Sequence, residues 1–139
     1  MRYALVDTGV WYAMFASGDP YAGSVDEKAE VLGQCQVVIP WPTMYETLRT
    51  KFVKKAPALH QFRTYLKHPR VQYLDDVSYR EQAMEIAFSS ALVDRRPLSM
   101  IDCLIRLIMN DSNVRIDVLA TFNPKDFADV CRKRRIELI

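Results

Sequence analysis

The sequence has few of the residues that build disulfide scaffolds, zinc sites or membrane spans. It contains three cysteines and two histidines, and the cysteines lack the close pairing of a zinc site or a redox motif. We therefore expect reduced, packed thiols and surface histidines at His60 and His68. No apolar run approaches the ~18 residues that span a membrane, and Asp7 interrupts the apolar N-terminus where a signal peptide would continue. The sequence predicts a soluble protein of the cytoplasm.

The short apolar runs that are present predict the fold class. Runs at residues 3–6, 37–39, 71–74 and 118–122 suit strands buried on both faces, and residues 136–139 suit an edge strand. Helical segments are expected at residues 10–15, 22–32, 41–52, 57–66, 80–92, 101–108 and 124–132, with a turn at 18–20. This alternation indicates a three-layer α/β/α fold around a central parallel sheet of four to five strands. The length suits a single domain over residues 1–139.

Two of the helical segments have a distinct apolar face. Pro42 suits the first helical position of one segment, whose face consists of four residues at helical spacing: Trp41, Tyr45, Leu48 and Phe52. Glu46 lies beside this face. The second has the spacing of a well-buried helix: Ile101, Leu104, Ile105 and Ile108. Ser99 is placed to cap that helix.

Polar side chains from distant parts of the chain fall near the carboxyl ends of the predicted strands. Asp7 ends the first strand, Glu46 follows the second, and Asp102 lies in the first turn of the buried helix. Asn123 ends the fourth strand, with Asp126 just beyond it. Because ligands gather beyond the carboxyl ends of parallel strands, we expect these side chains to converge on one acidic pocket.

Such a pocket predicts a divalent metal site. Only oxygen ligands are at hand, and these select Mg²⁺ or Mn²⁺ over zinc. We expect Asp7, Glu46 and Asp102 to be the ligands. Three hydroxyl residues are placed to orient a ligand or a water behind them: Thr8, Ser99 and Thr121. Bound divalent ions neutralise a phosphate and lower the pKa of a coordinated water, so the pocket permits phosphodiester hydrolysis.

The charge balance is compatible with a polyanionic substrate. The net charge is +2, and setting aside the three expected ligands leaves 19 basic residues against 14 acidic ones, a net charge of +5. Local groups of basic residues include residues 49–55, Arg95 with Arg96, and residues 132–135. We interpret most of them as solvated faces.

Each of these residues also has an interpretation that involves no metal. Asp7 suits the N-cap of the following helix, and Asp102 can complete a capping box with the serine three residues before it. Glu46 can pair with Arg49 on a helix surface. Residues 123–126 read as an N-cap, a proline at the first helical position and an acid at the third. The joint placement of the acids, not any one residue, therefore favours the metal site.

Three segments resemble PIN domains, and among them the VapC-like toxins of bacterial and archaeal toxin–antitoxin pairs. Residues 4–8 are an apolar strand that runs into Asp7 and Thr8. Residues 98–105 are similar to the family's Ser-x-x-Asp followed by a buried helix. Residues 119–127 are similar to its strand followed by Thr-x-Asn/Asp-x-x-Asp-Phe. Together the segments extend the resemblance over essentially the whole chain.

The resemblance implies an activity and a set of partners. It implies metal ligation by Asp7 and Asp102, a supporting role for Glu46, and a fourth polar position at Asn123 or Asp126. Asn123 stands where many members have an acid, so we place Asp126 in the catalytic set and Asn123 behind it. The resemblance also implies RNA as the substrate, a homodimer, and a cognate antitoxin protein that covers the acidic pocket.

Two other functions remain as alternatives to a metal-dependent endoribonuclease toxin. Asp7-Thr8-Gly9 is similar to the Asp-Thr-Gly of aspartic proteases, but that class is all-β and this sequence has several helical segments. The second alternative is a PIN-fold RNA-binding or assembly module without catalysis. A metal-dependent RNA cleavage assay separates that module from the nuclease.

Overall fold

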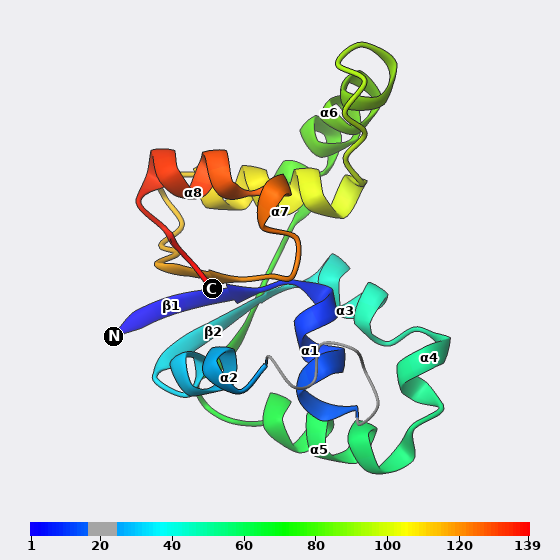
Figure 1. The fold of residues 1–139 in the computed structure, drawn as a ribbon, viewed down its shortest axis with the longest axis vertical. Coiled ribbons are helices and arrows are strands. Elements are labelled where there is room, and N and C mark those ends of the chain that lie inside the picture. Colours follow the sequence, from blue (N-terminus) through cyan, green and yellow to red (C-terminus); the bar gives the residue numbers. More distant parts are fainter. Residues whose placement is uncertain (17–24) are drawn as a thin grey trace.

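Five parallel strands form the centre of the computed structural model, which describes residues 1–16 and 25–139 (Figure 1). The strands are β1 (Arg2–Val6), β2 (Cys35–Pro40), β3 (Val71–Leu74), β4 (Val118–Ala120) and β5 (Glu137–Leu138). Their order is β3-β2-β1-β4-β5, and every neighbouring pair is parallel. The predicted central parallel sheet is therefore confirmed, with residues 136–139 at its edge as expected.

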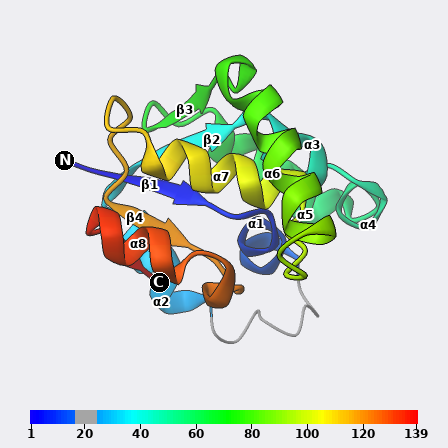
Figure 2. The same cartoon turned by 90° about the horizontal axis from the view of Figure 1, so that it is seen from above.

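Helices cover both faces of the sheet. One face carries α1 (Thr8–Phe15), α2 (Asp26–Leu32), α3 (Trp41–Thr47), α4 (Thr50–Val53) and α5 (Ala56–Leu66). The other carries α6 (Arg80–Leu92), α7 (Met100–Asn110) and α8 (Ala128–Arg134). Two 3₁₀ helices, η2 (Val77–Tyr79) and η3 (Pro124–Asp126), precede α6 and α8. In Figure 2, α7 lies across β1 and α8 lies beside β4. The three-layer α/β/α prediction is thus confirmed.

The alternation of side chains along the buried strands produces two hydrophobic cores. On β1, Ala4 and Val6 face the α1–α5 side, and Leu5 faces the α6–α8 side. On β4, Leu119 likewise points to the side opposite its two neighbours. Because both faces are covered, these strands read in the sequence as continuous apolar runs. The rings of Trp11 and Phe62, 5.3 Å apart, tie α1 to α5 within the first core.

The helix expected over residues 41–52 is interrupted, and its buried face was predicted wrongly. α3 ends at Thr47, and a new helix begins at Thr50. Trp41, Tyr45 and Leu48 are 42%, 70% and 42% exposed, whereas Thr43 and Thr47 are buried. The Thr43 hydroxyl donates to the carbonyl of Pro40 (2.7 Å), and the Thr47 hydroxyl donates to the carbonyl of Thr43 (2.6 Å). Both hydroxyls are satisfied by backbone, so their burial costs little.

Other boundaries shift by a few residues. α2 begins at Asp26; residues 22–24 of the expected helix and the turn at 18–20 lie outside the described residues. The helix expected over 124–132 is divided into η3 and α8 at Phe127, whose φ of −131° is not helical. The fourth strand ends at Ala120.

The expectations for cysteine and histidine agree with the structure. The three cysteines are buried and free: Cys35, Cys103 and Cys131. His60 and His68 are exposed. None of the described helices is long and apolar enough to cross a membrane.

Candidate functional site

Asp7 is anchored where the ends of β1 and β4 meet. It is 8% exposed and forms the N-cap of α1. Its Oδ1 accepts a hydrogen bond from the backbone N–H of Thr8, and its Oδ2 accepts one from the hydroxyl of Thr121, both at 2.8 Å. The capping interpretation is therefore correct, but it accounts for only one carboxylate oxygen. The other is fixed by a residue 114 positions away, which a helix cap does not require.

Three carboxylates from different elements each have a pKa that is raised by burial and by at least one neighbouring acid. Burial is the main cause that raises the pKa of Asp7, and the charge of Asp126 adds to it. Burial also raises the pKa of Glu46, with further increases from Asp7 and Asp102, while Arg49 lowers it. The pKa of Asp102 is raised by burial and then by Asp7 and Asp126, against hydrogen bonding from its capping serine. The four acids predicted from the sequence are thus brought to one end of the sheet.

Thr121 links Asp7 to the segment that follows β4. Its hydroxyl donates to Asp7 and accepts a hydrogen bond from the backbone N–H of Asn123 at 3.0 Å. Asn123 stands at the N-cap position of η3, but its side chain makes no capping hydrogen bond. The expected cap is therefore not formed. At α7 the expected cap does form, since the hydroxyl of Ser99 accepts from the backbone N–H of Asp102 at 3.0 Å.

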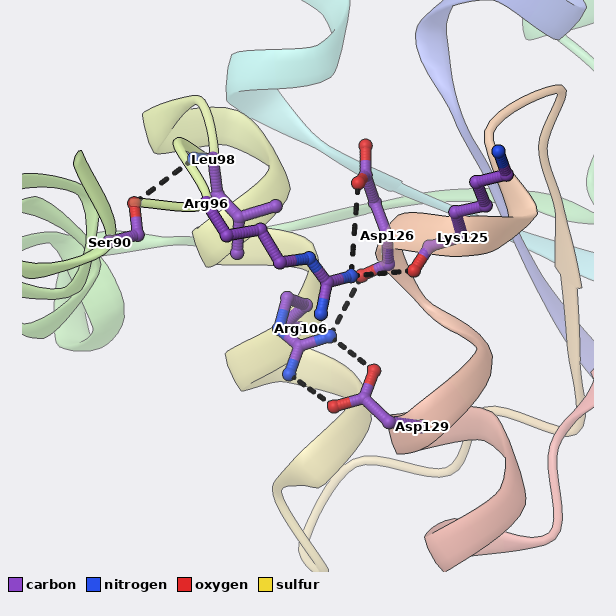
Figure 3. A network of polar contacts seen from close by, with 7 residues as sticks. All are labelled: Ser90, Arg96, Leu98, Arg106, Lys125, Asp126 and Asp129. Atoms are coloured by element: carbon purple, nitrogen blue, oxygen red, sulfur yellow. Dashed lines mark hydrogen bonds and ion pairs between the residues drawn. The ribbon is translucent and has the colours of Figure 1, made fainter. Parts of the chain in front are cut away.

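Two arginines hold the backbone that carries Asp126 (Figure 3). Arg96 donates to the carbonyl of Lys125 (2.6 Å) and lies 4.0 Å from the Asp126 carboxylate. Arg106 donates to the carbonyl of Asp126 (2.7 Å) and pairs through both terminal nitrogens with Asp129 (2.6 and 2.7 Å). This pairing lowers the pKa of Asp129 to about 2. The sequence reasoning missed Arg106; its signal was a cation on the largely apolar α7, between Ile105 and Leu107.

A pocket of about 580 Å³ opens beside the acids. Thr8, Glu46 and Asn123 are part of its wall, together with the basic residues Arg49 and Lys51. Those two cations come from the segment interpreted as a solvated face. The pocket therefore places positive charge next to the acidic cluster, as binding of a phosphodiester would require.

The donor set suits a hard cation, although the side chains are not closed around a metal position. All candidate donors are oxygens, which Mg²⁺ and Mn²⁺ prefer. The hydroxyl of Thr8 is buried beside Asp7 and has no hydrogen-bond partner among the described residues. Within residues 1–16 and 25–139, however, no three acidic, histidine or cysteine side chains come close enough to hold a metal ion. A cation here would have to draw the carboxylates together.

Residues 4–133 match the model of the PIN domain. No curated protein sequence matches the chain. PIN domains are generally nucleases that act on nucleic acid, and they typically use divalent metals. The matched residues include β1 with Asp7, α7 with Asp102 and the segment after β4, so the chain belongs to the PIN domain family.

Proposed function

We propose that this chain is a metal-dependent endoribonuclease of the cytoplasm and the toxin of a toxin–antitoxin pair. The observation that carries the proposal is that Asp7 after β1, Glu46 of α3 and Asp102 of α7 each have a pKa raised by burial and by a neighbouring acid. Carboxylates that are desolvated and close to one another are held at a cost, and such sites are often functional. In a PIN domain, the function that explains this cost is phosphodiester hydrolysis.

Three of the four acids have the role of metal ligands in this proposal. Asp7, Glu46 and Asp102 would hold Mg²⁺ or Mn²⁺, because a bound cation relieves the repulsion that raises their pKa values. The ion, when bound, supplies positive charge against the phosphate and a water of lowered pKa. Thr121 fixes one oxygen of Asp7 through its hydroxyl. The hydroxyl of Thr8, which has no hydrogen-bond partner among the described residues, can donate a hydrogen bond to a water at the site or accept one from it.

The toxin role and the partners rest on the resemblance to VapC-like proteins. It implies two partners. One is an antitoxin that covers the acidic pocket, and the other is a second copy of this chain. A row of exposed apolar side chains on α6 supports the homodimer: Met84, Phe88 and Leu92 are 42%, 59% and 78% exposed. Residues four apart share one helix face, so this row offers a continuous apolar surface to a partner.

A PIN-fold RNA-binding module without catalysis is the second candidate. It is favoured by the absence, within the described part of the chain, of three ligating side chains close enough for a metal. It is disfavoured by the raised pKa values of the acids, because a binding surface for RNA gains nothing from desolvated negative charge.

We expect the purified protein to cleave single-stranded RNA when Mg²⁺ or Mn²⁺ is present and to stop when EDTA is added. The measurement is the length distribution of an end-labelled RNA over time. Activity should return when Mn²⁺ is supplied in excess of EDTA, which distinguishes loss of metal from damage to the protein. Cleavage that continues undiminished in EDTA contradicts the metal mechanism, and binding without cleavage at any metal concentration supports the second candidate.

We expect Asn123→Ala to cost less cleavage activity than Asp102→Asn, with Asp126→Asn between them. Asn123 carries no charge with which to stabilise a cation. The charge of the Asp126 carboxylate, in contrast, raises the pKa of both Asp7 and Asp102. Arg96, 4.0 Å from Asp126, offsets part of that charge and makes it a weaker ligand than Asp102. Cleavage rates beside calorimetric titration of Mn²⁺ rank the variants. If Asn123→Ala abolishes Mn²⁺ binding as fully as Asp102→Asn, then Asn123 itself is a ligand.

A further inference from the structure

We propose that the pocket beside the acids is a subsite for one unpaired nucleobase of single-stranded RNA, next to the phosphate that is cut. That the ligand is RNA rests on the proposed function. The new element is a position in the pocket that receives a base, together with the residues that would hold that base. Its support is the composition of the pocket wall, which combines aromatic rings with the acid Glu46 and the two cations Arg49 and Lys51.

The aromatic part of the wall comes from α1, α4 and the segment after β4. Tyr12, Phe52 and Phe122 all line the pocket. Phe52 is 1% exposed, and the Tyr12 ring packs edge-on against it with centroids 5.4 Å apart, so the Tyr12 ring is held in a fixed orientation. Opposite Phe122, Gly9 has no side chain; a Cβ added there would lie 4.0 Å from the ring. That distance is close to an ordinary van der Waals contact, so Gly9 and the Phe122 ring lie near one another in the pocket wall.

Cations lie next to the rings of Tyr12 and Phe122. The ammonium of Lys51 is 4.5 Å from the centroid of the Tyr12 ring, and that of Lys28 is 5.1 Å from the centroid of the Phe122 ring. Arg49 and Lys51 also line the pocket. A base stacked on either ring would thus have a cation within reach of its own phosphate. Aromatic faces with nearby cations are the usual combination for binding single strands.

The other walls favour a base over a second phosphate. Glu46 in the pocket wall repels anions, whereas Arg49 and Lys51 attract them, so we expect the sugar-phosphate backbone to lie next to these two cations. Asn123 lines the pocket and makes no cap to η3, so its amide can donate to and accept from the edge of a base. A volume of about 580 Å³ lies within the range of pockets that enclose small organic groups.

Double-stranded RNA does not fit this arrangement. Its bases are stacked and paired, and aromatic side chains reach bases mainly in single strands, loops and ends. The subsite therefore selects an unpaired nucleotide.

The test compares two fluorescein-labelled RNA hexamers in EDTA by fluorescence anisotropy. One carries mixed bases, and the other is abasic with the same ribose-phosphate backbone. We expect the parent protein to bind the base-bearing hexamer more tightly. Phe122→Leu and Tyr12→Leu should each weaken binding of that hexamer about ten-fold, the size of one base–aromatic stacking contact, and leave the abasic hexamer unchanged. Arg49→Ala should weaken the binding of both hexamers by the same factor.

Tyr3→Leu is the matched control. Tyr3 is also an aromatic residue beside a cation, with the Arg115 guanidinium 5.3 Å from its ring, but it lies at the amino end of β1, away from the pocket. It should leave both affinities at the parent values. Thermal melts establish whether each variant is folded. If one of the two aromatic variants does not fold, the other still tests the subsite.

Equal affinities for the two hexamers in the parent protein, or a difference that persists in both aromatic variants, would overturn the subsite. So would failure of the parent to bind either hexamer, which would leave a protein partner as the occupant. These outcomes are separate from the nuclease proposal, because no metal or cleavage is involved. A protein that distinguishes the hexamers but cuts no RNA has the subsite without the activity; one that cuts RNA without distinguishing them has the activity alone.

Discussion

Asp102→Asn is expected to lower RNA cleavage by about 100-fold or more and, in EDTA at neutral pH, to raise the midpoint of thermal unfolding. Loss of a partner behind a metal ligand already costs about 10- to 100-fold, so loss of a ligand charge should cost at least as much. The gain in stability follows from the raised pKa of Asp102, which means that its ionised form is less favourable in the folded chain than in the unfolded one. Asparagine removes that charge and retains the backbone N–H that Ser99 caps.

The sign of the pH dependence follows from the same shift. Because the folded pKa of Asp102 lies above its ordinary value, the contribution of Asp102 to the free energy of unfolding falls as the pH rises from the ordinary pKa through the raised one. Below the ordinary pKa, the carboxyl is protonated in both states. The difference in melting midpoint between variant and parent should therefore vanish in acid and be fully present at neutral pH.

Metal reverses this order of stabilities. Mn²⁺ binds only the folded parent and should raise its melting midpoint, whereas Asp102→Asn should respond little. Glu81→Gln is the matched control, since Glu81 is an exposed acid in the first turn of α6. It should leave cleavage and the response to Mn²⁺ at parent values. A variant of Asp102 that melts lower than the parent in EDTA and keeps its activity would mean that the residue serves only the helix.

The strand pattern allowed much of this site to be predicted from sequence. Asp7 and Asn123 follow apolar runs that suit strands buried on both faces, and the carboxyl ends of parallel strands share one edge. Asp102 follows its capping serine by three residues, which fixes it in a first helical turn. These positions depend on local patterns, and local patterns are present in the sequence.

The missed features depend on how the helices are oriented in the fold. The sequence did not indicate that α1 turns Tyr12 toward the pocket, because that depends on how the helix packs against α3 and α4. Nor did it indicate that α3 buries threonines and exposes Trp41, since the hydroxyls are satisfied by backbone carbonyls and the Trp41 ring instead stacks on Tyr73 of β3 at 4.4 Å. Arg106 was missed because its partners lie 20 and 23 residues away.

Asp7→Asn is expected to lower cleavage by about 100-fold or more while leaving the melting midpoint close to that of the parent. Asparagine caps helices about as well as aspartate, so the cap of α1 should persist. The asparagine side chain retains one oxygen as an acceptor for Thr8 or Thr121, where aspartate has two. That loss destabilises the chain, but removal of a desolvated charge offsets it. Activity has no such compensation, because a neutral amide is a poor ligand for Mg²⁺ or Mn²⁺.

Asp7→Ala provides the contrast. It removes the cap, worth about 1 kcal/mol, together with both accepted hydrogen bonds, so it should melt lower than Asp7→Asn. Asp75→Asn is the matched control, since Asp75 follows β3 as Asp7 follows β1 and accepts a hydrogen bond from the backbone N–H of Val77 (3.1 Å). It should cleave RNA like the parent. The measurements are paired cleavage rates and thermal melts, with rates divided by the folded fraction. If Asp7→Asn retains the specific activity of the parent, Asp7 is a helix cap and the proposed metal site must be assembled without it.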